Sequence, residues 1–239
     1  MKQRLDKLLV DRGLATDQKT AGAIILAGEV RGADRVLDKP GTMVEPDTEL
    51  NLKTHSRYVS RGGDKLASVA KVLGLDFQAK VVLDAGASTG GFTDYALQHG
   101  ATKVYAVDVG SAQLDYRLRK DARVVSVERT DIRELELPEP VDIIVMDLSF
   151  ISLTKVLEQV GRFLKADGII VVLAKPQFEA SKALADQYKG VIPEPERSRV
   201  LMELEAWLND QFKIVTQADS GMAGAQGNVE RFYKLILKH

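Results

Sequence analysis

From about residue 66 onward, short runs of apolar residues alternate with stretches in which apolar residues have helical spacing. The short runs predict buried strands and the other stretches predict covering helices, a pattern typical of a parallel sheet. Because parallel strands place their carboxyl ends along one edge, we expect a ligand site at that edge. The expected strands are Val81–Asp84, Lys103–Val107, Val124–Val127, Val141–Met146 and Gly168–Leu173.

The last third of the chain departs from this alternation. A helical pattern at about Glu196–Asn209 precedes an expected strand at Phe212–Ala218, and a glycine-rich loop leads to a final strand at Arg231–Leu237. Two strands joined by a loop without a helix must be antiparallel neighbours. The sequence therefore predicts an α/β fold whose mostly parallel sheet ends in an antiparallel strand, unlike the parallel sheet of a dinucleotide-binding dehydrogenase.

Residues 1–53 have a different pattern, which predicts a small α+β unit. Leucines at helical spacing indicate a first helix near residue 5, and a second helix is expected from about Asp17. Two short strands follow, separated by the turn signal Pro40-Gly41. We expect these strands at Glu29–Val36 and Thr42–Leu52.

Residues 54–65 are expected to link this unit to the main domain at residues 66–239. The stretch contains Arg57, Arg61 and Lys65 but only one acid, Asp64. It therefore resembles a basic linker and hinge.

The strand at Val81–Asp84 is followed by a loop of small residues that indicates a ligand pocket. Gly86, Gly90 and Gly91 allow positive φ and a close approach of the backbone to a ligand. The loop lacks both the Lys-Ser/Thr pair of a phosphate-binding P-loop and the spacing G-x-G-x-x-G. It therefore favours a nucleotide-like ligand that carries neither a triphosphate nor a pyrophosphate.

Aspartates follow successive expected strands. A single strand-end aspartate usually caps a helix, whereas several in succession favour a shared ligand, with Asp108 placed to accept the hydroxyls of a ribose. A metal site is the weaker interpretation, because strands a sheet-width apart cannot converge on one ion. The strand-end aspartates are Asp84, Asp108, Asp131 and Asp147.

Lys175 follows the fifth expected strand, where an unpaired ammonium group would be costly to desolvate. A lone lysine would more often be a surface residue with its charge in water. Asp147, at the end of the neighbouring strand, is its natural partner. We therefore expect a functional pair.

Composition limits the classes of function. The 239 residues are 45% hydrophobic and 28% charged, which is ordinary for a globular protein, and no apolar run is long enough to span a bilayer. The first residues do not resemble a secretory signal, and the absence of cysteine excludes disulfides and thiolate zinc sites. We expect a cytoplasmic protein. With a net charge of -1, nucleic-acid binding would need a local basic surface.

Five ordered motifs resemble those of the TlyA (hemolysin A) family over nearly the whole chain. They are RGGDKL at 61–66, DAGASTGGFT at 84–93, DLSFISL at 147–153, KPQFE at 175–179 and GNVE at 227–230. The resemblance implies an S-adenosylmethionine-dependent ribose methyltransferase of ribosomal RNA, with cytidine as the expected nucleotide. It also implies an alpha-L RNA-binding domain at residues 1–53 and an FtsJ-like, Rossmann-like domain with a seven-stranded sheet.

The resemblance further implies roles for individual residues. Lys65, Asp147, Lys175 and Glu230 match a catalytic tetrad, in which Lys175 is the expected base for the ribose hydroxyl. No metal is expected. The expected S-adenosylmethionine-binding residues are Asp84, Gly86, Ala87, Ser88, Thr89, Gly90, Gly91, Phe92, Asp108, Asp131 and Asp147, and the expected RNA-binding residues are Arg4, Lys7, Lys19, Arg57 and Arg61.

Two other functions remain as alternatives at this point. A non-catalytic RNA-binding or ribosome-assembly factor would bind RNA but not the methyl donor, and the complete tetrad argues against it. A membrane-lytic hemolysin, suggested by the older family name, would need a pore or a strongly amphipathic membrane helix, which the sequence does not resemble. The expected partner is ribosomal RNA or a ribosomal subunit, with no membrane; the oligomeric state is not predicted.

Overall fold

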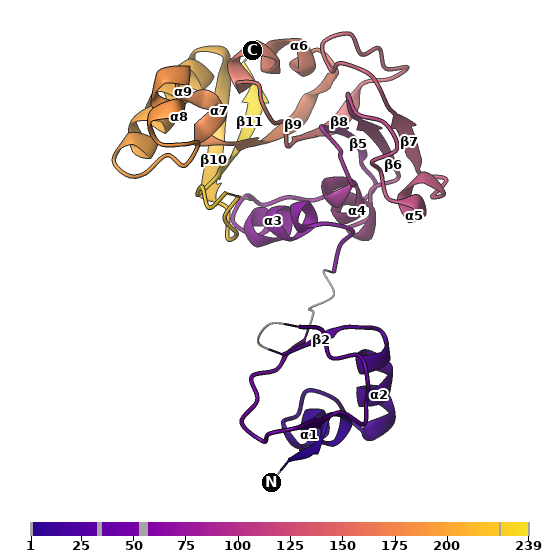
Figure 1. Cartoon of the computed structure of the whole chain (residues 1–239). Helices are drawn as coiled ribbons and strands as arrows, with labels where there is room; N and C mark the ends of the chain where they lie inside the picture. Colours follow the sequence, from indigo (N-terminus) through magenta and orange to yellow (C-terminus); the bar gives the residue numbers. More distant parts are fainter. Residues whose placement is uncertain (1, 33–34, 53–56, 225, 239) are drawn as a thin grey trace. The chain divides into compact units, whose positions relative to one another are not determined.

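The computed structural model describes residues 2–32, 35–52, 57–224 and 226–238 (Figure 1). The chain forms two compact units, Met1–His55 and Ser56–His239. We expected residues 54–65 to be a linker, but this is wrong for its second half, because helix α3 (Arg61–Ala70) begins there. The apolar face of that helix packs into the core of the second unit. The residues just before it belong to the same unit, since Tyr58 is buried there and the N–H of Val59 donates to Asp94. Residues 54–56 of the expected linker lie outside the described residues.

Two helices form the centre of the first unit. They are α1 (Leu5–Asp11) and α2 (Gln18–Leu26), and Asp17 caps α2 by accepting a hydrogen bond of 2.8 Å from the backbone N–H of Thr20. Such a cap satisfies one of the free N–H groups at a helix start. The core between the helices consists of Leu5, Leu8, Leu9, Ala21, Ile25, Val30, Leu37, Val44 and Leu50.

The strands of the first unit are shorter than the sequence predicted. In place of Glu29–Val36 and Thr42–Leu52, the described residues form only two-residue strands. A turn in which the N–H of Thr48 donates to the carbonyl of Glu45 interrupts the second expected strand, and Pro46 inside that turn has no N–H to offer a neighbouring strand. The strands are β1 (Gln3–Arg4), β2 (Val30–Arg31), β3 (Met43–Val44) and β4 (Asn51–Leu52), paired β1 with β3 and β2 with β4.

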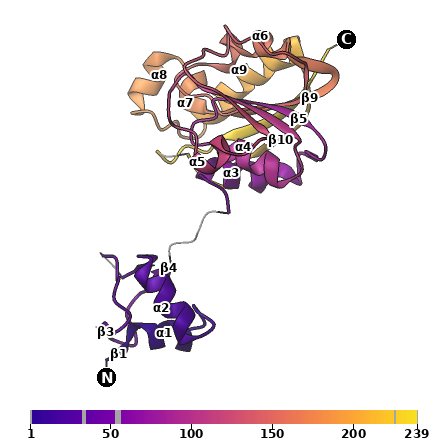
Figure 2. The same ribbon diagram turned by 90° about the vertical axis from the view of Figure 1, so that its right-hand side faces the viewer.

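The second unit contains the predicted sheet, which is confirmed. Its seven strands have the order β10-β11-β9-β8-β5-β6-β7, and within it β11 runs antiparallel to both of its neighbours while the other pairings are parallel (Figures 1 and 2). The strands are β5 (Val81–Ala85), β6 (Lys103–Val107), β7 (Val124–Val127), β8 (Val141–Met146), β9 (Leu164–Ala174), β10 (Phe212–Asp219) and β11 (Arg231–Leu237).

Helices cover both faces of this sheet (Figure 2). On one face, α3 and α4 (Gly91–Gln98) pack against one set of strand side chains, and on the other face α6 (Leu157–Gly161) and α9 (Glu196–Gln211) pack against the alternate set. The remaining helices are α5 (Tyr116–Arg119), η1 (Leu153–Lys155), α7 (Pro176–Glu179) and α8 (Lys182–Gln187).

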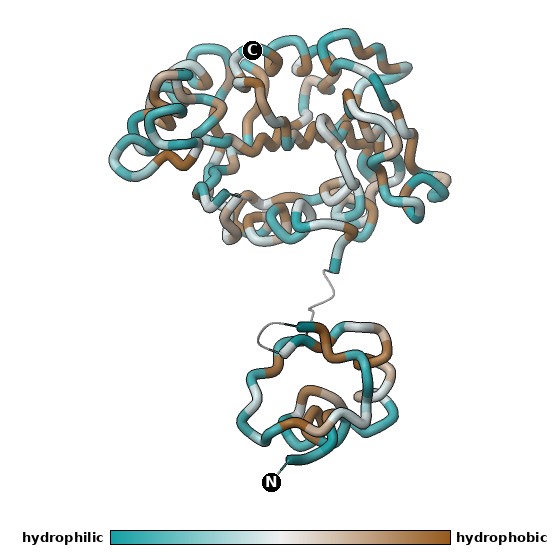
Figure 3. The backbone as a smooth tube through the Cα atoms, viewed as in Figure 1, coloured by the Kyte–Doolittle hydropathy of each residue, from teal (hydrophilic) through white to brown (hydrophobic). Residues whose placement is uncertain are grey.

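The central strands are apolar over most of their length, as Figure 3 shows. Strands β5 and β8 lie between others and are buried on both faces, which explains their continuous apolar runs. The edge strand β10 instead alternates buried or half-buried residues with exposed ones. None of the helices in the described ranges combines the length and apolar character needed to cross a membrane.

Candidate active site

A cavity with two lobes lies at the carboxyl ends of β5, β6, β7 and β8. The large lobe, of about 460 Å³, lies between residues 107–109, 130–132 and 147–151. The small lobe, of about 170 Å³, lies between Ser60, residues 86–89 and Lys175. Both are lined by Gly86, Ser88, Asp147 and Ser149, which therefore separate the lobes. The sequence placed a ligand at this edge of the sheet.

Gly86 brings the glycine loop against the end of β8. Its φ is +85°, and a Cβ atom at this position would lie only 2.9 Å from the carbonyl oxygen of Asp147. The N–H groups of Gly86 and Ala87 donate to the carbonyl of Val107 at 2.9 and 3.0 Å, so the loop is also fixed to β6. A side chain here would displace the strand end that carries Asp147.

Gly90 has a packing role, whereas we expected a ligand contact. It lines neither lobe, and a Cβ atom there would lie 2.3 Å from a methyl carbon of Leu118 and 2.7 Å from one of Leu114. Gly91 does line the small lobe, and a Cβ atom there would lie 2.4 Å from the hydroxyl oxygen of Ser60. Glycine thus lets the start of α3 approach the start of α4.

Asp84, at the end of β5, is 1% exposed and is bonded to the first turn of α4, just after the glycine loop. Its Oδ2 accepts hydrogen bonds from the backbone N–H and the hydroxyl of Thr93 at 2.9 and 2.7 Å. Its Oδ1 has no hydrogen-bond partner among the described residues, and Asp84 lines the small lobe. Burial raises the pKa of Asp84 to about 7, although the bonds from Thr93 oppose that shift. An unpaired carboxylate oxygen at this position suits a cationic group of a ligand.

Two further aspartates line the large lobe. Asp108 accepts hydrogen bonds from the N–H groups of Ser88 and Gly110 at 2.8 and 2.7 Å, so its carboxylate is held at the end of β6. Asp131 forms an ion pair of 2.5 Å with Arg133, whose hydrogen bonds lower the pKa of Asp131 to about 2. In the described part of the chain, no group of three or more acids and histidines is placed to hold a metal ion.

The four residues of the expected tetrad form two buried ion pairs. Lys175 Nζ lies 2.6 Å from Asp147 Oδ1, and Lys65 Nζ lies 2.5 Å from Glu230 Oε2. Because Arg231 is in register with Ala174, Glu230 and Lys175 occupy facing positions just beyond β11 and β9. Lys175 and Asp147 line the small lobe, whereas Lys65 and Glu230 are not among the residues that line it.

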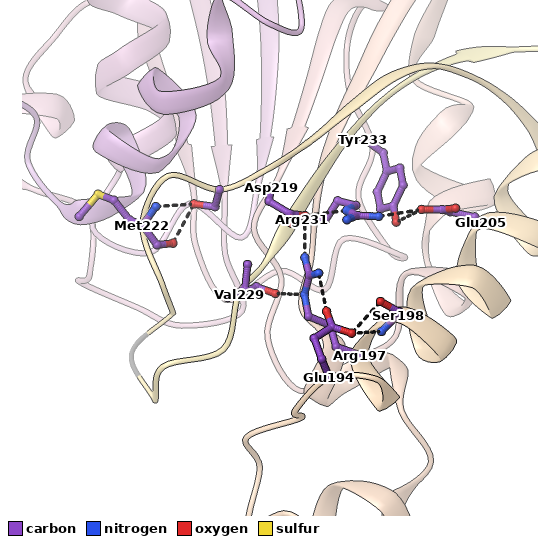
Figure 4. Close-up of polar contacts among 10 residues, drawn as sticks. Glu194, Arg197, Ser198, Glu205, Asp219, Met222, Val229, Arg231 and Tyr233 are labelled. Atoms are coloured by element: carbon purple, nitrogen blue, oxygen red, sulfur yellow. Dashed lines mark hydrogen bonds and ion pairs between the residues drawn. The ribbon is translucent and has the colours of Figure 1, made fainter.

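A polar network holds the backbone on either side of Glu230, and the sequence did not predict it. The buried Arg197 of α9 donates to the carbonyl of Val229 at 2.8 Å and to Asp219 at 2.6 Å (Figure 4). The N–H of Ser220 donates to the carbonyl of Glu230 at 2.8 Å. Helix α9 thus holds the backbone next to Glu230, whose carboxylate pairs with Lys65.

The loop after β8 carries an exposed aromatic side chain that the sequence also did not single out. Phe150 is 90% exposed, has a φ of +66°, and lines the large lobe. Its ring centroid lies 5.1 Å from that of Phe178 in α7. An exposed phenylalanine held in a strained conformation at a cavity rim indicates a binding role. Its place in the DLSF motif, directly after a strand end, was the available signal.

The three expected RNA-binding residues of the first unit differ in their surroundings. Arg4 forms an ion pair of 2.6 Å with Asp6, and its side chain remains half exposed. Lys7 and Lys19 are exposed. Lys7 and Lys19 can reach a phosphate without loss of a buried contact, whereas Arg4 is held by the buried carboxylate of Asp6.

Of the two expected RNA-binding residues in the second unit, one has a structural contact. Arg61 donates a hydrogen bond of 2.6 Å to the carbonyl of Ala223 and so holds the loop between β10 and β11. The guanidinium carbon of Arg57 lies 5.7 Å from the ring centroid of Tyr58, and Arg57 is exposed. Arg57 therefore remains the freer of the two for a phosphate.

Comparison with known proteins identifies the family of the chain that forms this cavity. Residues 58–235 match the model of the FtsJ-like methyltransferase family. The chain is 41% identical over 237 residues to the 16S/23S rRNA (cytidine-2'-O)-methyltransferase TlyA of Mycobacterium tuberculosis, covering 96% of this chain and 88% of that protein. It is 37% identical to Hemolysin A of Brachyspira hyodysenteriae, covering 98% of this chain and 100% of that protein.

A solved structure shows the same fold at similar identity. A candidate hemolysin from Streptococcus thermophilus matches with a TM-score of 0.74 and 37% identity, covering 99% of this chain and 89% of that chain. The family resemblance that the motifs predicted is confirmed. The chain belongs to the FtsJ-like methyltransferase family.

Proposed function

We propose that this protein transfers the methyl group of S-adenosylmethionine to a ribose 2′-hydroxyl of ribosomal RNA, with cytidine as the nucleotide. The observation that carries the proposal is the buried Lys175–Asp147 pair, 2.6 Å apart, in the wall of the small lobe. A ribose hydroxyl must lose its proton as it attacks, and the side-chain nitrogen of Lys175 can take that proton in its neutral amine form, with the carboxylate of Asp147 beside it. The name of the Mycobacterium tuberculosis relative supports the same reaction.

The cavity fits S-adenosylmethionine on two structural grounds. The unpaired Oδ1 of Asp84, a residue that lines the small lobe, suits an ammonium group, and Gly86 holds the glycine loop against the end of β8, where it lines both lobes. In the large lobe, Asp108 can accept ribose hydroxyls. When bound, the cofactor supplies an electrophilic methyl group on a positively charged sulfur. The acids around both lobes suit that charge better than they would suit phosphates.

The residues of the chain divide the work of the reaction. Lys175 Nζ, as a neutral amine, would accept the proton of the ribose hydroxyl, while bound S-adenosylmethionine would supply the methyl group. Asp147 neutralises the charge that this nitrogen gains. Lys65, held by Glu230, contributes a fixed positive charge that favours negative charge on the attacking oxygen.

The substrate nucleotide must leave its stack to reach this cavity. Phe150 at the rim offers an exposed ring on which a base turned out of RNA can stack. Residues 1–53 act as an RNA-binding domain, in which the exposed Lys7 and Lys19 contact backbone phosphates, as Arg57 does in the second unit. A ribosomal substrate places the protein in the cytoplasm.

Transfer of a labelled methyl group to ribosomal subunits tests the proposal. Wild-type protein should label ribosomal RNA, and the label should survive alkaline hydrolysis as a dinucleotide, since a 2′-O-methyl group blocks cleavage. Lys175→Ala should reduce the rate by about a hundredfold or more. Lys182→Ala, an exposed lysine on α8, is the matched control. Equal labelling by wild type and Lys175→Ala would refute the catalytic assignment, and RNA binding without cofactor binding would favour an assembly factor.

A further inference from the structure

Two oxygen atoms lie close to the side-chain nitrogen of Lys175, and they hold it in different ways. Nζ donates a hydrogen bond of 2.8 Å to Ser149 Oγ. Asp147 Oδ1 lies closer, at 2.6 Å, but this ion pair lacks the alignment of a hydrogen bond. Lys175 is only 8% exposed, so few water molecules can compete for the nitrogen. Ser149 therefore supplies the directional contact.

Direction matters because a base accepts a proton through one lone pair. A neutral amine has two N–H groups and one lone pair, and it rotates about the Cε–Nζ bond. Attraction to the charge of Asp147 fixes where the nitrogen lies, yet charge attraction has little angular preference, whereas a hydrogen bond weakens steeply when it is bent. With one N–H on Ser149 and the lone pair turned away from the carboxylate of Asp147, one orientation of the amine remains.

The loop that carries Ser149 is itself held in place by α7, the helix that Lys175 precedes. Glu179 accepts hydrogen bonds from the hydroxyl of Ser152 at 2.6 Å and from the N–H of Leu153 at 3.0 Å. Between these contacts and Ser149, the ring of Phe150 packs on α7. These contacts tie the loop that carries Ser149 to the helix that Lys175 precedes.

We propose that Ser149 is a positioning residue for methyl transfer, because its hydroxyl orients the lone pair of Lys175 toward the ribose hydroxyl. This inference rests on the proposed function, in which Lys175 is the base. Ser149 lines both lobes and shares the small lobe with Asp147 and Lys175. Its side chain is exposed, so loss of the hydroxyl removes no buried packing.

Three variants separate this role from a structural one. Ser149→Ala should lower kcat about tenfold, with little change in KM for ribosomal RNA. Ser149→Thr keeps a hydroxyl and should restore most of the rate. In a Lys175→Ala background, Ser149→Ala should cause no further loss, because a residue that acts through Lys175 has nothing left to orient. Ser126→Ala, an exposed serine on β7, is the control.

A second measurement does not depend on turnover. In Ser149→Ala, the Nζ hydrogens of Lys175 should exchange with water faster than in wild type, as nitrogen-detected magnetic resonance would show. Equal exchange rates in the two proteins would overturn the role of Ser149.

The outcomes distinguish a failure of the proposed function from a failure of the role of Ser149. A wild-type protein without methyl transfer would refute the proposed function and this inference with it. An active wild type matched by Ser149→Ala would overturn the role of Ser149 alone. A further loss in the double variant would also overturn it, since Ser149 would then act independently of Lys175.

Discussion

The carboxylate of Glu230 lies 2.5 Å from the side-chain nitrogen of Lys65, although 165 positions separate the two residues in the sequence. The pair joins the start of the last strand to the first helix of the second unit. Both side chains are largely buried, at 3% and 11% exposure. The contact therefore ties the last strand of the sheet to helix α3.

We expect loss of either charge in this pair to destabilise the protein. Lys65→Met or Glu230→Gln alone should each lower the free energy of unfolding by about 3 kcal/mol, because a buried charge is left without its partner. The double variant should lose less than the sum of the two. Urea denaturation measures all three proteins. Arg199→Ala, which breaks a surface pair with Glu196, should change little. Additive losses in the double variant would show that the pair is not coupled.

Asp84 should make stability depend on pH. Its pKa is raised to about 7 in the folded protein from 3.8 in the unfolded chain. Between these values the folded state binds one proton more, so the free energy of unfolding falls as the pH rises from about 4 to about 7. Between pH 5 and pH 8, wild type should lose about 2 to 3 kcal/mol relative to Asp84→Asn, which keeps an oxygen for Thr93. Parallel pH profiles of the two proteins would contradict the raised pKa.

Phe150 should act on RNA and not on folding. Phe150→Ala should lower kcat/KM for ribosomal RNA about tenfold, because stacking contributes about 1 to 3 kcal/mol for each base. Cofactor affinity and the melting temperature should remain unchanged, since the ring is 90% exposed. Phe150→Trp should retain activity. Met202→Ala, an exposed residue on α9, is the control, and equal losses in both alanine variants would exclude a specific role.

Arg197 should be needed for the position of Glu230. Arg197→Met should destabilise the protein by about 3 kcal/mol or more, because the carbonyl of Val229 loses its donor and Asp219 loses one of two arginine partners. Methyl transfer should fall at temperatures where the variant is still folded. Arg199→Ala, an exposed arginine on the same helix, provides the comparison. Full activity in folded Arg197→Met would mean that the network is structural only.

Gly86 should tolerate no side chain. Gly86→Ala combines a positive φ with a Cβ atom 2.9 Å from the carbonyl of Asp147, so we expect cofactor affinity to fall at least tenfold. Gly227→Ala, in the same unit as the cavity, shares the positive φ, but nothing lies within 4 Å of its added carbon. Calorimetry of both variants separates backbone strain from the clash. Unchanged affinity in Gly86→Ala would show that the strand end can move aside.

The sequence predicted the sheet well because its central strands, such as β5 and β8, are buried on both faces. The bounds of β6, β7, β8 and β11 agree with expectation, since short apolar runs bounded by turn residues are typical of buried strands. Strand β9 begins earlier than expected, at Leu164, because polar residues in its first part hid the pattern. In the first unit, two-residue strands leave no such pattern at all.

The sequence singled out candidate site residues at strand ends, such as Asp108 and Asp131, which line the large lobe, but not residues that act through tertiary contacts. Asp108 and Asp131 were found because parallel strands place them at one edge. The contact of Arg197 with Val229, and that of Lys175 with Ser149, depend on how helices and loops pack. Gly90 was assigned to the ligand because spacing cannot distinguish a glycine that faces a pocket from one that faces Leu118.

The place of β11 between β9 and β10 has a consequence for the order of assembly. Strand β11, which brings Glu230 to Lys65, follows the other six strands of the sheet in the sequence. Because β10 pairs only with β11, β10 cannot join the sheet before β11 does. A chain still being synthesised can form the glycine loop and the β5–β8 pairing, but Lys65 then has no counter-charge from Glu230. Long-range pairing of this kind forms late and slowly. The Lys65–Glu230 pair therefore forms in the same step that completes the native sheet, and under the proposed function we expect a chain that lacks β11 to be inactive in methyl transfer.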